Sequence, residues 1–213
     1  MSSPKTSRKK TSRKKKPAAA KVGSRRTCIL VLGMHRSGTS ALTRVLSLMG
    51  AALPKHVMGA HEGNSSGHWE PERLVAYHDA ILAELNSGWQ DWRPLDLGGL
   101  PDEPMRIRAH IHGIVEHEYG DAPLFVIKDP RICRFPGLFI EAMEERGIEV
   151  VPVIILRNPL DVIASLESRT VAWPEDYTAA DAGLLWLTHV LEAEQVSRGC
   201  RRAIVSYDAL MED

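Results

Sequence analysis

The sequence predicts an α/β fold in which a parallel β-sheet is flanked by helices on both faces. Two observations support this class. After residue 26, short apolar segments alternate with longer segments of helical periodicity, which is the pattern of repeated strand–helix units. Polar motifs directly follow three of the apolar segments, and parallel sheets bind ligands beyond the carboxyl ends of their strands.

The elements are expected in a regular order along the 213 residues. Short apolar runs predict strands at residues 28–32, 124–127, 150–156 and 203–206. Helical periodicity predicts helices at residues 39–49, after Pro71, around 107–115, before 146, at 158–168 and at 178–198. Pro71 and Pro159 suit the first turn of their helices. Residues 51–70 lack periodicity and are long enough to form a functional loop.

Residues 1–26 differ in composition from the rest of the chain. They contain eleven Lys or Arg and no Asp or Glu, and the remainder has a net charge of −11, because 16 basic residues stand against 27 acidic ones. With few apolar residues to bury, this segment is expected to be a disordered basic tail, and residues 27–213 are expected to form one domain. The tail is either a solvated extension or an electrostatic contact for nucleic acid or another anionic surface.

Cysteine usage and hydropathy narrow the class of protein. Cys28, Cys133 and Cys200 are odd in number and widely spaced, which indicates reduced thiols rather than a disulfide framework or a zinc site. No apolar run approaches the ~18 residues needed to span a membrane, and no signal-peptide pattern follows the N-terminal charges. These features predict a cytoplasmic protein without a transmembrane segment.

The most informative motif is GMHRSGTS, which follows the first expected strand. Gly33 and Gly38 have the spacing of the phosphate-binding loop of nucleotide kinases, G-x-x-x-x-G-K-[ST]. Thr39 stands where that loop has its lysine, and the nearby cation is Arg36. Such a turn directs backbone N–H groups at an anion, and the helix N-terminus adds about half a positive charge. The motif therefore predicts an anion site on a P-loop-type sheet, with its cation displaced from the kinase position.

Two further cations follow neighbouring strands. Lys128 ends the second strand within KDPR and is expected to point into a ligand cleft, since lysine is poorly placed in a core. Arg157 follows the third strand within RNPLDVIAS, and Ser165 lies almost two turns into the helix after it. Both can face one anion at that helix N-terminus, which Asn158 is expected to cap.

In order and spacing these motifs resemble those of the PAPS-dependent sulfotransferases, in which 3′-phosphoadenosine 5′-phosphosulfate (PAPS) is the sulfuryl donor. The resemblance covers about residues 27–213 and includes VSYDALMED and the N-x-x-G-x-W-E segment of bacterial members at residues 64–70. It implies that the 5′-phosphosulfate is held by Arg36, Ser37, Gly38, Thr39 and Ser40. It also implies that Arg157 and Ser165 hold the 3′-phosphate, which distinguishes PAPS from ATP.

The resemblance also implies catalytic roles. Arg36 and Lys128 would be the catalytic cations, with Lys128 stabilising charge on the bridging oxygen as the sulfuryl group departs. No metal is expected. The acceptor would be a hydroxyl of a small molecule or carbohydrate, and its proton requires a base. Glu70 is the first candidate, and His61, Glu62 and His68 are rivals from the same loop.

Two departures from the family pattern affect these expectations. The best-known cytosolic members use a histidine two residues after the strand-end lysine as base, and here that position is Pro130, so Asp129 is a weaker alternative. Cytosolic members also have a late glycine-rich basic segment that closes over the 3′-phosphate and adenine, and nothing after Asp213 supplies it. The domain is therefore expected to be short or truncated at its C-terminal end.

Two other functions are consistent with the same motifs. A P-loop kinase for a nucleotide or small molecule would have the same loop and sheet. Against this alternative, the sequence has no lysine directly after Gly38 and no obvious acidic residue at a strand end to hold Mg²⁺. A non-catalytic module, tethered by the basic tail, is the second alternative.

Overall fold

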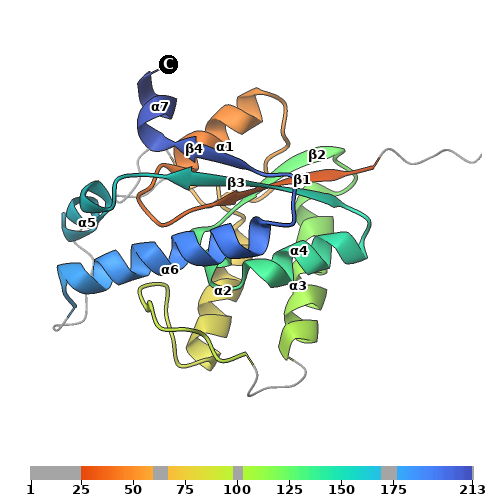
Figure 1. Ribbon diagram of the computed structural model, residues 1–213. Coiled ribbons are helices and arrows are strands. Elements are labelled where there is room, and N and C mark those ends of the chain that lie inside the picture. The colour runs from red at the N-terminus through yellow and green to blue at the C-terminus, as the bar shows by residue number, and fades with distance from the viewer. Residues whose placement is uncertain (1–24, 60–66, 98–102, 169–176, 213) are drawn as a thin grey trace, which may run out of the picture.

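The computed structural model describes residues 25–59, 67–97, 103–168 and 177–212 (Figure 1). Its centre is a parallel four-stranded sheet of order β2-β1-β3-β4. The strands are β1 (Thr27–Leu32), β2 (Leu124–Lys128), β3 (Glu149–Leu156) and β4 (Ala203–Ser206). The four predicted strands and their parallel arrangement are confirmed, each within one residue at either end.

The described ranges contain seven α-helices and one 3-10 helix. They are α1 (Thr39–Leu48), α2 (Glu72–Glu84), α3 (Glu103–Tyr119), the 3-10 helix η1 (Pro130–Arg134), α4 (Pro136–Glu145), α5 (Pro159–Glu167), α6 (Ala179–Ser197) and α7 (Tyr207–Glu212). The six predicted α-helices are present. The sequence prediction did not include η1 or α7. The 3-10 turn forms because Asp129 caps it, accepting from the Arg131 N–H, and because a proline begins both η1 and α4.

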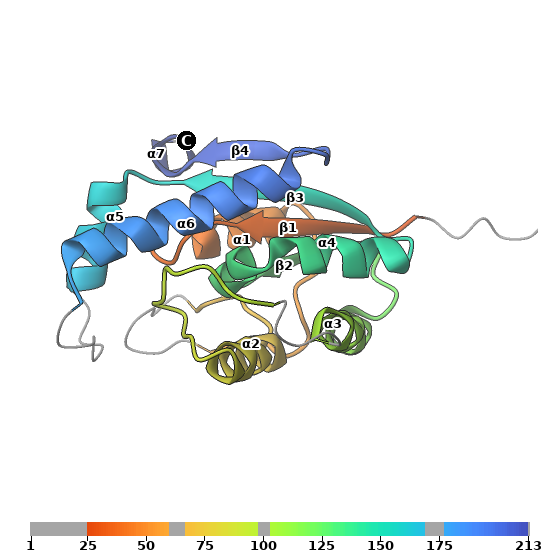
Figure 2. The same cartoon turned by 60° about the horizontal axis from the view of Figure 1, so that its bottom comes forward.

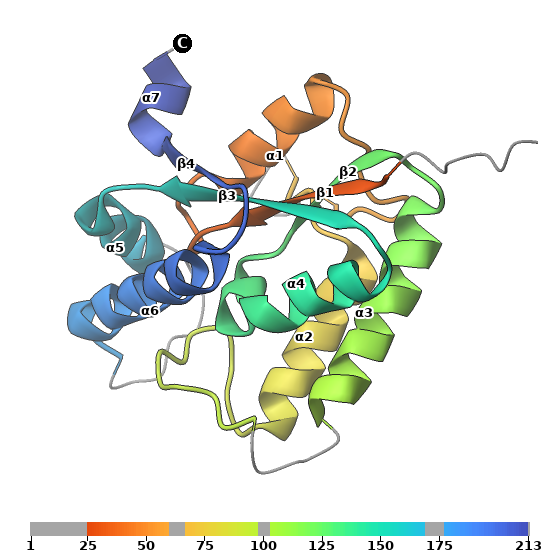
Figure 3. The ribbon, with the colours of Figure 1, turned by 45° about the vertical axis from the view of Figure 1, so that its right-hand side comes forward.

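Helices cover both faces of the sheet, as expected for an all-parallel sheet. Helix α1 lies on one face, and α4 and α6 lie on the other, with α2 and α3 farther out on that side (Figures 1, 2 and 3). The larger core forms between the sheet and this second group of helices, around Phe125, Phe139 and Ile111. A smaller core lies under α1, around Val31, Leu42 and Ile155. The prediction of an α/β fold with helices on both faces is confirmed.

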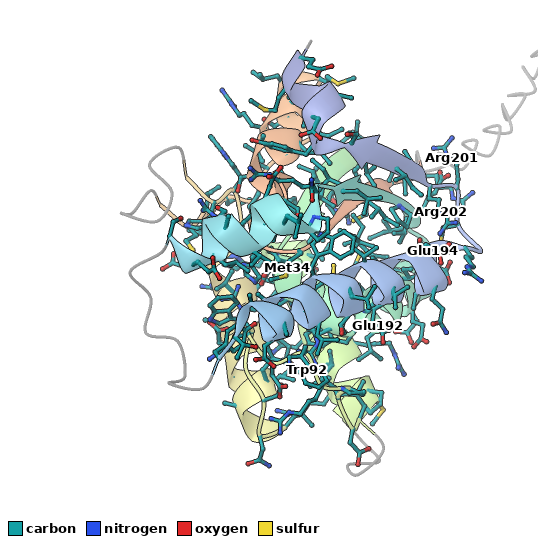
Figure 4. All side chains as sticks on the ribbon, turned by 60° about the vertical axis from the view of Figure 1, so that its left-hand side comes forward. Met34, Trp92, Glu192, Glu194, Arg201 and Arg202 are labelled. Atoms are coloured by element: carbon teal, nitrogen blue, oxygen red, sulfur yellow. The ribbon has the colours of Figure 1, made fainter. Side chains whose placement is uncertain are left out.

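Helix termini are fixed by local side chains. Asn158 caps α5 by accepting a hydrogen bond from the Leu160 N–H at 3.0 Å, as predicted. Thr178 and Asp181 form a reciprocal capping box at the start of α6. At the other end of α6, Glu194 pairs with Arg202 at 3.0 Å, and Figure 4 shows both beside Arg201. This ion pair joins the end of α6 to the residue that precedes β4.

Three other expectations concern the whole chain. All three cysteines are free thiols, as predicted. Among the described residues, the helices are all too short or too polar to cross a bilayer. Residues 1–24 of the basic tail lie outside the described residues.

Candidate anion and transfer site

One cavity of about 540 Å³ lies at the carboxyl ends of β1 and β2 and beside the end of β3. Because parallel strands end at the same edge of a sheet, their following residues converge there. Seven of the nine predicted site residues line this cavity: Arg36, Gly38, Thr39, Ser40, Glu70, Lys128 and Arg157. Of the remaining two, Ser37 lies in the turn between β1 and α1, and Ser165 lies in α5.

The turn between β1 and α1 is fixed by two glycines. Gly33 has φ +152°, and a Cβ there would lie 2.8 Å from the Ile155 carbonyl oxygen on β3. Gly38 has φ +89°, and a Cβ there would lie 2.2 Å from Cδ2 of Tyr207. Arg36 also adopts a positive φ of 68°, which is uncommon for a residue with a side chain. The turn is therefore shaped by close backbone approach to β3 and to the start of α7.

The base of this turn is attached to η1 through a thiol. The Gly33 N–H donates to Sγ of Cys133 at 3.2 Å. Burial raises the pKa of Cys133 to about 12, so the group stays a neutral thiol near neutral pH. Cys133 thus acts as a packed acceptor that holds the turn, and it is not a candidate nucleophile.

The N-terminus of α1 opens into the cavity and can bind an anion. No side chain caps this helix, so its first N–H groups lack intrahelical acceptors and carry the positive end of the dipole. Ser37 is 1% exposed, and its hydroxyl has no hydrogen-bond partner among the described residues. A buried hydroxyl without a partner is costly, and an oxygen of a bound anion would satisfy it.

Lys128 and Glu70 form a buried ion pair at the floor of the cavity. Lys128 Nζ lies 2.5 Å from Glu70 Oε1, and the two side chains are 2% and 4% exposed. Lys128 Nζ also donates to the His68 carbonyl oxygen at 2.9 Å and to Ser40 Oγ at 3.2 Å. The three donors of this ammonium group therefore point at three oxygens of the site, one of which, Ser40 Oγ, belongs to the first turn of α1.

The environment of Glu70 favours its protonated form more than water does. Burial raises the pKa of this carboxyl, and the charge and hydrogen bond of Lys128 oppose that rise only in part. A carboxyl with a raised pKa is better matched to proton transfer near neutral pH. The chain enters this position through Trp69, whose φ of 59° turns the backbone back toward α2.

The second predicted anion site is joined to the first through Arg36. Arg36 Nε donates to Ser165 Oγ at 2.9 Å, and Arg157 Nη1 donates to the Arg36 carbonyl oxygen at 2.9 Å. The Arg157 guanidinium lies over the Tyr207 ring, 4.5 Å from its centroid, in a cation–π arrangement. Arg157 thus borders the cavity as predicted, whereas Ser165 contacts Arg36.

Asp129 and Arg131 of the KDPR motif form hydrogen bonds and ion pairs with neighbouring side chains. Asp129 is fully buried and accepts from Nδ1 of His78 at 2.7 Å and from Arg131 at 3.0 Å. Burial alone would raise the pKa of Asp129, but the hydrogen bond and charge of His78, with Arg131, hold it well below its ordinary value. Arg131 also pairs with Asp79 at 2.6 Å. Asp129 is therefore a poor proton acceptor and organises the turn after β2.

The candidate bases are Glu70 and three other residues of the same loop. His61 and Glu62 lie outside the described residues. His68 lines the cavity, and its backbone carbonyl accepts from Lys128. Glu70 is the predicted base whose carboxylate directly contacts the strand-end lysine.

Two titratable residues of the cavity were missed by sequence reasoning. Arg44 follows Ser40 by one helical turn on α1, and its guanidinium lies 5.0 Å from the Trp69 ring centroid; the i, i+4 spacing is the signal that could have indicated it. His35 lies in the turn, with its ring 4.8 Å from that of Trp89. Burial and nearby cations lower the pKa of His35, so its imidazole is neutral.

Comparisons with known proteins match this chain to solved structures. No protein-family model matches the chain, and no curated protein matches it. Among solved structures, the chain is similar to a sulfotransferase domain from the curacin biosynthetic pathway, with 20% identity and a TM-score of 0.49, over 89% of this chain and 70% of that one.

Proposed function

We propose that this protein is a PAPS-dependent sulfotransferase that moves a sulfuryl group to an acceptor hydroxyl. The observation that carries the proposal is the buried Lys128–Glu70 pair, 2.5 Å apart, beside an uncapped helix N-terminus. The pair supplies a cation for a leaving oxygen and a carboxylate for a proton within one cavity that also binds anions.

The turn would hold the 5′-phosphosulfate. The buried Ser37 hydroxyl has no hydrogen-bond partner among the described residues, and the first turn of α1 and Arg36 line the cavity beside it. Arginine binds phosphate and sulfate oxygens through a planar fork. Arg157, also in the cavity wall, would bind the 3′-phosphate, and the ring of Tyr207 holds its guanidinium in place.

Lys128 and Glu70 would have separate roles in the transfer step. The acceptor oxygen forms a bond to sulfur, the bond from sulfur to the bridging phosphate oxygen breaks, and 3′,5′-adenosine bisphosphate (PAP) leaves with that electron pair. Glu70 takes the proton of the acceptor hydroxyl, and Lys128 stabilises charge on the departing oxygen. Because Lys128 donates to three protein oxygens, one of these hydrogen bonds must yield to the leaving group.

The acceptor proposed for testing first is a carbohydrate hydroxyl. Trp69 lines the cavity next to Glu70, and an aromatic face can stack on a sugar ring while a neighbouring carboxylate reaches the hydroxyl. Small phenols have the same requirements and belong in the same panel.

Ligand-dependent stability tests the donor site. At 100 times its Kd, PAP should raise the free energy of unfolding by about 2.7 kcal/mol, which is a Tm increase of roughly 5–11 °C for a domain of this size. ATP with Mg²⁺ should give less. A larger increase with ATP and Mg²⁺ than with PAP would favour the kinase alternative, and no increase with either would argue against both.

Specific variants test the assigned roles. Arg157→Ala should remove the preference for PAP over AMP. The control is Arg146→Ala, which replaces an exposed arginine at the end of α4 and should keep that preference. In a transfer assay with labelled PAPS over the acceptor panel, Glu70→Gln should lower kcat at neutral pH while PAP still binds. A Glu70→Gln enzyme with the full transfer rate would show that the base lies elsewhere.

A further inference from the structure

A second polar cluster lies away from the anion-binding cavity, where the last turn of α3 meets the loop before α2. It consists of His56 from the loop and of His117 and Glu118 from the helix. None of the three lines the cavity described above. The side chains of His56 and His117 are 54% and 42% exposed, whereas that of Glu118 is completely shielded.

The ligand atoms of this cluster converge on one point. Oε1 of Glu118 lies 3.2 Å from Nδ1 of His56 and 3.1 Å from Nδ1 of His117. One nitrogen or oxygen from each residue lies within 4.8 Å of the other two. Tetrahedral Zn²⁺ with bonds of 2.0–2.2 Å requires ligand atoms about 3.3 Å apart, so small side-chain adjustments suffice to place a metal between them.

The carboxylate is already oriented for this role. Its other oxygen, Oε2, accepts a hydrogen bond from the backbone N–H of His56 at 2.8 Å. That bond fixes the carboxylate plane, with Nδ1 of His56 3.2 Å from both carboxylate oxygens and Nδ1 of His117 3.1 Å from Oε1. Hydrogen bonds to the outer oxygen of a ligating carboxylate are a general feature of protein metal sites.

The charge balance of the cluster also favours a cation. In the part of the chain that the structure describes, the ion pairs of Glu118 involve only the two histidines, with no lysine or arginine. A shielded carboxylate requires a compensating charge. The cluster also lies at the C-terminus of a 17-residue helix, where the negative end of the dipole attracts cations.

We propose that Nδ1 of His56, Nδ1 of His117 and Oε1 of Glu118 bind a zinc-class divalent transition metal. Two imidazoles and one carboxylate form a donor set that Zn²⁺ accepts, with the fourth position left to water. Imidazole ligands disfavour Mg²⁺ and Ca²⁺, which prefer oxygen. The exposed edges of the two rings give the metal an entry path.

Metal binding here would fasten the segment that carries Glu70. The Glu72 N–H donates to the His56 carbonyl oxygen at 3.0 Å, and the Met58 N–H donates to the Glu70 carbonyl oxygen at 2.8 Å. Residues 56–58 and 70–72 are thus joined as a short antiparallel bridge. A metal that holds His56 against α3 therefore also holds this bridge; only the catalytic meaning of that effect rests on the proposed function.

Metal titration of the untagged, full-length protein tests this site directly. After chelation and dialysis, Zn²⁺ should bind with a stoichiometry of one per chain, and Co²⁺ should give the visible absorption of a four-coordinate complex. His117→Ala and Glu118→Gln should weaken Zn²⁺ binding roughly 100-fold or more, because loss of an outer-shell partner alone costs 10–100-fold. His110→Ala removes another exposed histidine of α3 and should leave binding unchanged.

The outcomes separate this site from nonspecific binding and from the sulfotransferase proposal. His117 is exposed, so His117→Ala stays folded even if Glu118→Gln does not. No Zn²⁺ binding at 100 µM, or equal weakening by His110→Ala and His117→Ala among the nine histidines of the chain, would overturn the proposal. Zn²⁺ should also raise the Tm of the wild type and not that of His117→Ala. This readout does not depend on PAPS or on any transfer activity.

Discussion

Replacing Lys128 with methionine leaves the carboxylate of Glu70 without its partner in a buried site. The two side chains are 2% and 4% exposed, so water cannot replace the lost ammonium group. Breaking a buried pair from one side costs about 3–5 kcal/mol, because the remaining charge is uncompensated. Typical domains have 5–15 kcal/mol of stability, so the variant should still fold, with much of its margin lost.

The decisive quantity is the effect of Glu70→Gln in two backgrounds. In the wild type, Glu70→Gln should destabilise the protein, because it leaves the Lys128 ammonium group buried without a carboxylate. In the Lys128→Met background it should be neutral or stabilising, because it removes the uncompensated carboxylate. The sign of the change therefore reverses, and the coupling energy should be at least about 3–5 kcal/mol, above the 0.5–3 kcal/mol typical of contacting residues.

Urea unfolding followed by the fluorescence of the five tryptophans measures this coupling. The control is the ion pair of Arg106 and Glu84, which has the same 2.5 Å separation but side chains that are 47% and 52% exposed. Its cycle of Arg106→Met and Glu84→Gln should give at most about 1 kcal/mol. If Glu70→Gln costs the same in both backgrounds, within about 0.5 kcal/mol, the buried-pair argument is wrong.

Three other changes follow from the same structure. Gly38→Ala should lower the free energy of unfolding by about 1–2 kcal/mol because of the left-handed backbone at this position. The loss should be larger still, because the new Cβ would lie 2.2 Å from the Tyr207 ring. If urea unfolding gives the same loss in the Tyr207→Ala background, the ring contact does not contribute. The raised pKa of Glu70 means that the folded state keeps its proton to higher pH than the unfolded state. Between pH 4.5 and that raised pKa, wild-type stability relative to Glu70→Gln should therefore fall as pH rises, by up to about 1.4 kcal/mol per pH unit, and a flat difference would contradict the shift. Thr178→Ala removes the cap of α6, where Oγ1 accepts from the Asp181 N–H at 3.3 Å; its Tm should drop by an amount equivalent to about 1 kcal/mol, and an unchanged Tm would show that the cap is not needed.

The strands and most helices could be predicted because their signals are local. In β1, residues 28–32 are all apolar, as expected for a strand covered on both faces. Asn158 followed by Pro159 marks a helix start by cap chemistry alone, and the structure has that cap. The 3-10 turn at 130–134 was missed because Asp129 and Pro130 suit the start of either helix type.

The contacts within the site could not be derived in the same way. The prediction that Lys128 faces a cleft depended on its position at a strand end. Its pairing with Glu70, 58 positions away in sequence, depends on the left-handed backbone of Trp69, which no propensity favours. The cluster of His56 and Glu118 was missed for a similar reason, since its members are 62 positions apart and meet only when the loop packs against α3.

The register of the sheet sets how far apart the residues that follow β2 and β3 begin. Val31 on the central strand β1 is paired with Lys128 on one side and with Val153 on the other. Arg157 therefore lies four residues further along its strand direction than Lys128, and two strands across. With a rise of about 3.3 Å per residue and strands about 4.8 Å apart, the two Cα atoms are roughly 16 Å from each other. Two cations whose backbones are that far apart suit an elongated donor with anionic groups at separate positions, as proposed above, better than a compact ion such as sulfate. In the proposed function, the register of β2 and β3 would therefore contribute to the preference for a ligand whose charges are separated.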